Sequence, residues 1–271
     1  MPTPEQQRLV DAMSAALAED AAVEAAWLAG SLGRGGGDAF SDVDVLALCA
    51  DGAWEAASAR WQAGVGRIGE PMLVMPLYGG RVVNVVTAGW ERFDVTFVTA
   101  ADLGRYDAAQ LTPLFNRAGR EPPRREPAPY RPSPQAITAM VTEYLRVIGL
   151  SPVAFGRGEH LVTLSGVELL RGMTLNLLLE ANGVSPEARG GALRRNPFLT
   201  AGQRAALEAI PPVSADPASL LAANRALTAI FLPAARDLAA AIGAEWPTAL
   251  EAATRRRLES FFGEPWPELG G

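Results

Sequence analysis

The chain has 271 residues, of which 49% are hydrophobic and 20% charged, a composition typical of a globular protein with a sizeable core rather than a disordered chain. The formal net charge of −6 argues against a protein that binds nucleic-acid phosphates over a broad surface. All 24 basic residues are arginine and there is one histidine, which disfavours lysine-dependent P-loop and kinase sites and a paired-histidine zinc site.

Nothing in the sequence indicates export or a membrane. The one cysteine, Cys49, cannot form an intrachain disulfide, so nothing indicates an oxidising compartment. The first residues, "MPTPEQQRLV", lack the basic and apolar regions of a signal peptide, and we find no apolar run as long as a membrane span. We therefore expect a cytoplasmic protein that does not bind a membrane.

The first half of the chain predicts a mixed α/β unit. Apolar residues recur with helical spacing over residues 4–20, and a two-glycine loop after "MLVMPLY" favours a tight hairpin. The predicted strands are "VEAAWLAG", "DVDVLALC", "MLVMPLY", "RVVNVVTA" and "RFDVTFVTA", with a helix at "AWEAASARWQAGV" between the second and third. We therefore expect a sheet that spans roughly residues 23–99.

The second half predicts helices only. Residues 121–134 contain six prolines and are expected to form an extended, semi-rigid connection. Beyond it, helical patterns cover residues 135–149, 160–182, 200–209, 217–242 and 247–262. The predicted organisation is thus an α+β domain over residues 1–120, a proline-rich linker over 121–134 and an all-helical domain over 135–271.

The segment "GSLGRGGGDAFSDVD" predicts a site for a metal-bound nucleoside triphosphate. Asp42 and Asp44 open a strand and, with one residue between them, point to the same side. Two like charges held together are unfavourable without a cation, and Mg²⁺ prefers carboxylate oxygens together with substrate phosphates. Gly30 lets the backbone approach a phosphate, and Ser31 offers a hydroxyl and amide donors. Arg34 could neutralise phosphate charge from the same turn.

Asp94 is a candidate third carboxylate. It interrupts an apolar strand, "RFDVTFV", at a position where burial without a partner is unfavourable. A site with two Mg²⁺ ions needs such a carboxylate on a neighbouring strand. The alternatives are a solvated hairpin around the glycines, with Asp94 facing water, and a calcium loop. "DVDVLAL" lacks the alternating ligands and closing glutamate of a calcium loop.

The spacing of Gly-Ser, Asp-x-Asp and a third strand carboxylate resembles the signature of the nucleotidyltransferase superfamily that includes DNA polymerase β. Within it, the layout is most similar to the two-domain antibiotic nucleotidyltransferases, which act on lincosamides or aminoglycosides. The resemblance rests on "GS…G.GD..SD.D" and "FDVTF" and, more loosely, on "GRGE…TLNLLLEANG" in the second half. No clear acceptor-binding motif is present.

The resemblance implies phosphate binding by Gly30 and Ser31 and magnesium binding by Asp42 and Asp44. It implies that Asp94 is the third ligand or the general base, and that the helical domain lines the acceptor pocket. The implied reaction is transfer of a nucleoside monophosphate, AMP from ATP or another nucleoside triphosphate, to a hydroxyl of a small molecule, with antibiotic resistance as the implied role. A protein or RNA acceptor and a non-catalytic nucleotide-binding scaffold remain alternatives.

The helical half offers few indications of the acceptor. Residues 1–134 hold 12 arginines against 17 acidic residues, and residues 135–271 hold 12 against 13. The near-neutral second half favours a weakly charged acceptor over a polycation. Glu159, Glu168 and Glu180 are expected on solvated helix faces, with a base for the acceptor hydroxyl as the alternative. The aromatic residues of "RLESFFGEPWPEL" are expected to pack the tail, or, if exposed, to form a homodimer surface.

Overall fold

The computed structural model describes residues 2–126, 129–186, 188–189 and 194–267. Contacts between residues divide the chain into two compact units, residues 1–127 and 128–271. The predicted linker includes residues 127–128, which lie outside the described residues, and its parts 121–126 and 129–133 form no helix or strand.

The first unit is built on a six-stranded mixed sheet with the strand order β3-β4-β5-β2-β1-β6. Within it, β2 and β5 are parallel and the other neighbouring pairs are antiparallel. The strands are β1 (Val23–Leu28), β2 (Val43–Cys49), β3 (Pro71–Leu77), β4 (Val82–Thr87), β5 (Arg92–Val98) and β6 (Thr112–Asn116).

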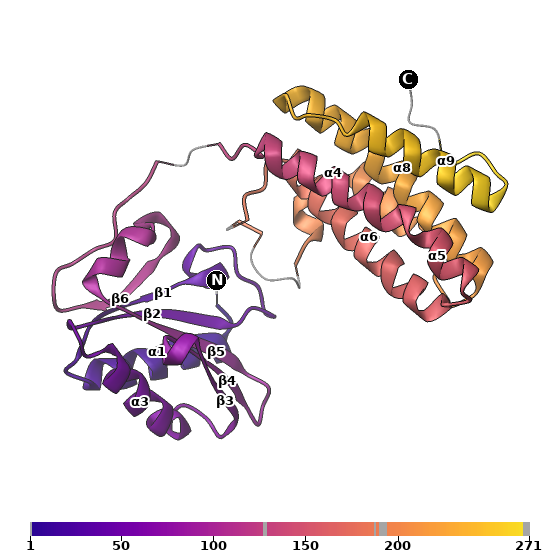
Figure 1. Ribbon diagram of the computed structural model, residues 1–271. Helices are drawn as coiled ribbons and strands as arrows, with labels where there is room; N and C mark the ends of the chain where they lie inside the picture. Colours follow the sequence, from indigo (N-terminus) through magenta and orange to yellow (C-terminus); the bar gives the residue numbers. More distant parts are fainter. Residues whose placement is uncertain (1, 127–128, 187, 190–193, 268–271) are drawn as a thin grey trace. The chain divides into compact units, whose positions relative to one another are not determined.

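Two helices, α1 (Pro4–Glu19) and α3 (Trp54–Gly64), pack against the sheet (Figure 1). The side chains that they cover come from alternate strand positions and form the main core of the unit, which includes Val45 of β2 and Val95 of β5. The positions between them face the other side of the sheet, where a smaller cluster forms around Trp27 and Leu46. This alternation is the one that the strand patterns predict.

The sheet extends further along the chain than the sequence predicts. The expected range ended near residue 99, but β6 adds a sixth strand that pairs with β1 at the edge of the sheet. Pro113 lies inside this strand, and proline is tolerated at a sheet edge because its missing N–H faces away from the ladder. The expected two-glycine hairpin is present, and Gly79 and Gly80 both have positive φ angles, 70° and 93°.

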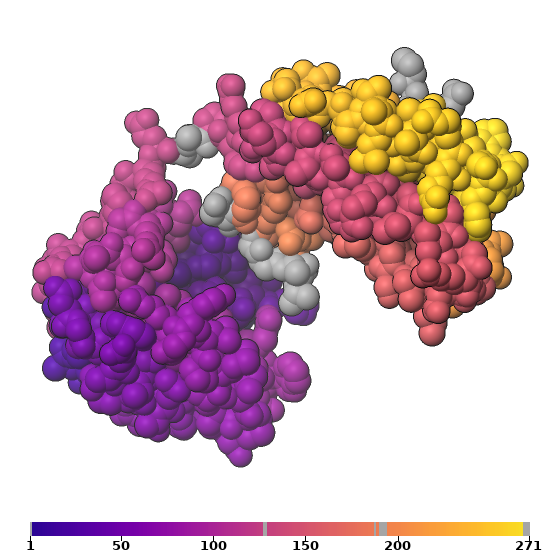
Figure 2. Space-filling model, in the orientation of Figure 1, coloured from indigo at the N-terminus to yellow at the C-terminus, as the bar shows by residue number. Residues whose placement is uncertain are grey.

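The described residues of the second unit form helices and no strand. Tyr144 of α4 and Phe231 of α8 stack at 3.7 Å in its core, and the yellow surface of α9 lies beside that of α4 in Figure 2. Trp266 is buried, so this part of the tail packs as expected. The helices are α4 (Pro134–Gly149), α5 (Ser151–Gly156), α6 (His160–Ala181), α7 (Ala201–Glu208), α8 (Pro217–Ile242) and α9 (Thr248–Phe262).

Two of these helices correct the expectation about membrane-length segments. In the part of the chain that the structure describes, α6 and α8 are long and apolar enough to cross a membrane by length and composition alone. The core helices of soluble proteins pass the same test. Both helices contribute residues to the core of the second unit, among them Leu170 and Leu227.

Candidate active site

Three carboxylates meet at the N-terminal ends of the two central strands of the sheet, β2 and β5. Asp42 immediately precedes β2, Asp44 lies in β2 and Asp94 lies in β5. Because β2 and β5 are parallel neighbours with Asp44 paired to Asp94, their side chains leave the same face of the sheet. One carboxylate oxygen from each residue lies within 4.8 Å of the others, and all three residues are half-buried. This is a spacing at which the three groups can share a cation.

The clustering of the carboxylates changes their acidity. Burial, together with the charges of Asp42 and Asp94, raises the pKa of Asp44 from 3.8 to about 6. Burial also raises the pKa of Asp94, and a hydrogen bond from Asn84 opposes that rise. Like charges in a partly desolvated cluster disfavour the ionised form. A divalent cation would reverse this effect, so the donor set fits a magnesium ion.

The turn after β1 is packed directly against Asp44. The Ala29 amide donates a hydrogen bond of 2.8 Å to the Asp44 carbonyl, which ties the turn to the start of β2. Gly30 follows with a φ of +58°, and a Cβ atom at this position would lie 1.7 Å from Asp44 Oδ2. Only glycine fits here, both because of the backbone conformation and because of the carboxylate beside it. The Gly-Ser spacing thus has a steric cause in addition to any role in phosphate binding.

The other two residues singled out in this turn lie close by. Ser31 belongs to the four-residue helix α2 (Gly30–Gly33), and its carbonyl accepts a 2.9 Å hydrogen bond from Gly36. Arg34 directly follows α2 and is exposed. The positive charge of Arg34 lowers the pKa of Asp44, against the larger effects of burial and of the neighbouring carboxylates. The structure thus places the three carboxylates and Gly30 next to one another, with Ser31 and Arg34 in the turn that follows Gly30.

A buried glutamine that sequence reasoning missed holds the loop before Asp42. Gln6 of α1 donates its side-chain amide to the carbonyls of Asp38 and Ser41, each at 2.8 Å. A second anchor is Arg92, which donates to the Phe40 carbonyl at 2.8 Å. The Thr3–Gln6 spacing is a helix capping box, so the sequence indicates a helix start here. It contains no signal that the same glutamine reaches a loop more than thirty residues away.

Glu180, a candidate base in the helical unit, does not lie on a solvated face. It is buried, accepts a 2.7 Å hydrogen bond from the Tyr130 hydroxyl and forms an ion pair with Arg189 at 2.5 Å. Its carboxylate is therefore held by two partners within its own unit. Glu168 is exposed near Arg171, and Glu159 is the residue before α6, as expected for helix-surface positions.

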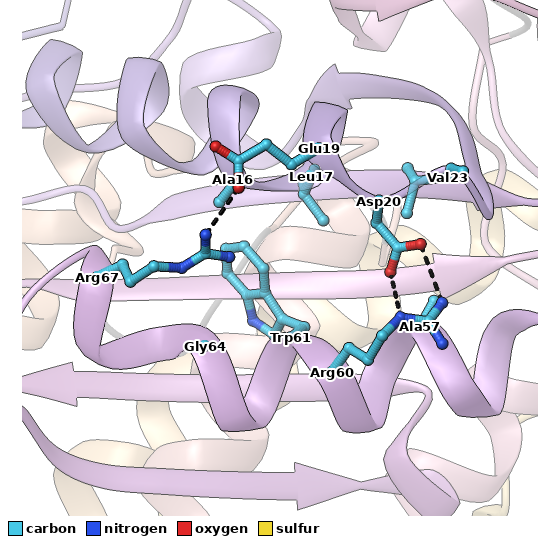
Figure 3. A pocket seen from close by; sticks show the side chains of 11 residues that line it. Ala16, Leu17, Glu19, Asp20, Val23, Ala57, Arg60, Trp61, Gly64 and Arg67 are labelled. Carbon is cyan, nitrogen blue, oxygen red and sulfur yellow. Dashed lines mark hydrogen bonds and ion pairs between the residues drawn. The ribbon is translucent and has the colours of Figure 1, made fainter.

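A hollow of about 300 Å³ lies elsewhere in the first unit, between α1 and α3 (Figure 3). The four charged side chains that line it pair with one another. Arg60 donates to both carboxylate oxygens of Asp20, at 2.8 and 2.9 Å, and Arg67 contacts Glu19 at 2.7 Å. The hollow lies on the helix-covered side of the sheet, whereas the three carboxylates leave the opposite face. Its arginines are already neutralised, so it is a poor site for a triphosphate.

Comparison with known proteins identifies no family. No family model matches the chain, and no curated protein matches its sequence. Ten chains of solved structures match, and one of them is an aminoglycoside 6-adenyltransferase from Bacillus subtilis. It shares 12% sequence identity and a TM-score of 0.47, over 97% of this chain and 100% of that chain. A likeness at this level carries no conclusion about activity.

Proposed function

We propose that the protein is a magnesium-dependent nucleotidyltransferase that moves AMP from ATP, or the corresponding group of another nucleoside triphosphate, to a hydroxyl of a small molecule. The observation that carries the proposal is the meeting of three carboxylates within 4.8 Å beside a glycine turn that packs on one of them. A surface hairpin has no need for either feature, since crowding carboxylates is unfavourable without a ligand.

Asp42, Asp44 and Asp94 would hold the magnesium, which would supply positive charge for the leaving pyrophosphate and activate the acceptor oxygen. The oxygen of the acceptor hydroxyl attacks the α-phosphorus of the nucleotide. The bond from that phosphorus to the β-phosphate oxygen breaks, and pyrophosphate leaves with the bonding electrons. The proton of the acceptor hydroxyl passes to the carboxylate of Asp94, which lies next to Asn84 in the sheet.

The turn after β1 would bind the triphosphate. The backbone of Gly30 and the hydroxyl and amide of Ser31 donate hydrogen bonds to phosphate oxygens, while the Arg34 side chain adds positive charge. These groups bind and orient rather than react. Positioning and charge stabilisation are the main contributions that a protein makes to phosphoryl chemistry.

The helical unit, residues 128–271, is the part that we assign to the acceptor. Residues 135–271 carry 12 arginines against 13 acidic residues. Glu180 and Glu251, two of the acidic side chains, are each neutralised by arginine within the unit. Such a surface attracts a polycation weakly. We therefore favour a weakly charged hydroxylated acceptor, such as a lincosamide, over an aminoglycoside, and a resistance role would follow from that acceptor.

The test is a screen for pyrophosphate release with magnesium and each of the four common nucleoside triphosphates. The acceptors are a lincosamide, an aminoglycoside, a protein extract and RNA, and Asp44→Asn serves as the inactive control. Release that depends on a small acceptor and is lost in the control supports the proposal. Release only with protein or RNA reassigns the acceptor, and nucleotide binding without release from any acceptor indicates a scaffold.

A further inference from the structure

One polar residue interrupts the run of valines in strand β4. Strand β4 reads "VVNVVT", and Asn84 is its central polar position. Val82 and Val86 lie on the same face of β4 as Asn84, two residues to either side. An amide on a half-buried strand position is less favourable than a β-branched residue. Asn84 therefore needs a polar partner.

That partner is Asp94. In the register of the sheet, Asn84 is directly opposite Asp94, and Asp94 is directly opposite Asp44. Three polar side chains thus form one row across the adjacent strands β4, β5 and β2. Side chains directly opposite each other on antiparallel strands have Cβ atoms about 4.5–5.5 Å apart, which is within reach of a hydrogen bond between an amide and a carboxylate.

The geometry points to Asn84 as a positioning residue of the carboxylate cluster. The side-chain amide of Asn84 donates a hydrogen bond to Asp94. We propose that this bond holds one oxygen of Asp94 and so leaves the other oxygen directed at a divalent cation shared with Asp42 and Asp44. Without this donor, repulsion from the two neighbouring carboxylates would turn Asp94 away from them. The inference rests on the metal site of the proposed function and adds a fourth residue to it.

The expected size of the effect comes from comparable sites. Residues that do not touch the metal but donate a hydrogen bond to one of its ligands contribute about 10- to 100-fold to metal affinity. Asn84→Leu keeps a side chain of similar size on the strand and removes the donor. Val82→Ala is the matched control, because Val82 lies on the same strand and face but is opposite Thr96.

The experiment is calorimetric titration of the nucleotide-free protein with Mn²⁺ at pH 7.5, with Asp44→Asn to identify the site. We expect Asn84→Leu to bind Mn²⁺ about 10- to 100-fold more weakly than the wild type, and Val82→Ala to bind within about twofold of it. Thermal unfolding in a chelator should show that Asn84→Leu is folded and no less stable, because leucine suits the strand.

Three outcomes would overturn the assignment, and they are distinguishable. Equal Mn²⁺ affinity in the wild type and Asn84→Leu, with loss in Asp44→Asn, removes the role of Asn84 and leaves the metal site intact. Equal weakening in Asn84→Leu and Val82→Ala indicates strand packing rather than a donor. No Mn²⁺ binding by the wild type rejects the metal site, and with it both the positioning role and the proposed function.

Discussion

Replacing Asp44 by asparagine should make the metal-free protein more stable at pH 8, although Asp44 belongs to the proposed active site. The change keeps the shape of the side chain and removes its charge. Burial and two neighbouring carboxylates raise the pKa of Asp44 from 3.8 to about 6. A shift of about two units corresponds to roughly 3 kcal/mol. Solvent screening at this half-buried group reduces the expected gain to about 2 kcal/mol.

The direction of the pH dependence follows from proton binding. Between pH 4 and pH 6 the folded protein keeps a proton on Asp44 that the unfolded chain has lost. The free energy of unfolding therefore falls as the pH rises through this window and stays low above it. Asp44→Asn lacks this group, so the variant and the wild type should differ little at pH 4 and most at pH 8.

The assay is urea denaturation in a chelator at pH 4, 6 and 8. Asp51→Asn, which removes an exposed carboxylate of the same unit, is the control and should change the free energy of unfolding by less than about 0.5 kcal/mol. Adding Mg²⁺ at pH 8 should stabilise the wild type, because a ligand that binds only the folded state raises its stability, and should not stabilise Asp44→Asn. The reasoning is refuted if Asp44→Asn equals the wild type, or is less stable, at pH 8 without metal.

Three further substitutions test other parts of the site. Gly30→Ala places a Cβ atom 1.7 Å from Asp44 Oδ2 and should lower Mn²⁺ affinity at least about tenfold. The control is Gly35→Ala, because Gly35 also has a positive φ but open space around it, and this change should add only about 1 kcal/mol of backbone strain. Equal Mn²⁺ affinities of the two variants in titration would contradict the steric account. Ser31→Ala should weaken ATP binding by about 1–2 kcal/mol with Mn²⁺ affinity unchanged, and calorimetry that finds full ATP affinity would place the phosphates elsewhere. Gln6→Ala removes two hydrogen bonds to loop carbonyls and should lower the free energy of unfolding, measured in urea, by about 2 kcal/mol. Gln7→Ala is the control and should have little effect, because the Gln7 side chain makes only an exposed contact with Asp11.

The local sequence was sufficient for most helices and strands. The helix expected over residues 217–242 has those bounds in the structure, because its apolar spacing and its Asp216 cap are local features. The strand β6 was missed, since "TPLFN" is short and contains proline, and only pairing with β1 makes it a strand. The helix α5 (Ser151–Gly156) was missed because six residues show too little periodicity.

The contacts of Glu180 also could not be predicted from the local sequence. Glu180 was expected on a solvated helix face, and the pattern of its own helix cannot reveal that Tyr130 and Arg189 approach it. The structure decides such contacts because they join residues that lie nine and fifty positions away along the chain. Hydrophobic periodicity describes which face of a helix is apolar, and it contains no information on which polar group covers a particular position.

By itself, the sequence indicated that Asp42 and Asp44 point to the same side, because side chains alternate with a period of two, although the strand itself begins at Val43. It also determined that a glycine-rich turn precedes them and that Asp94 lies in another strand. Only the tertiary structure decided that β5 lies parallel to β2 with Asp94 in register with Asp44, that Gly30 packs against Asp44, and that Asn84 completes the row. Strand order and register depend on the packing of the whole sheet and its helices, and these long-range interactions leave no periodic trace in any one segment.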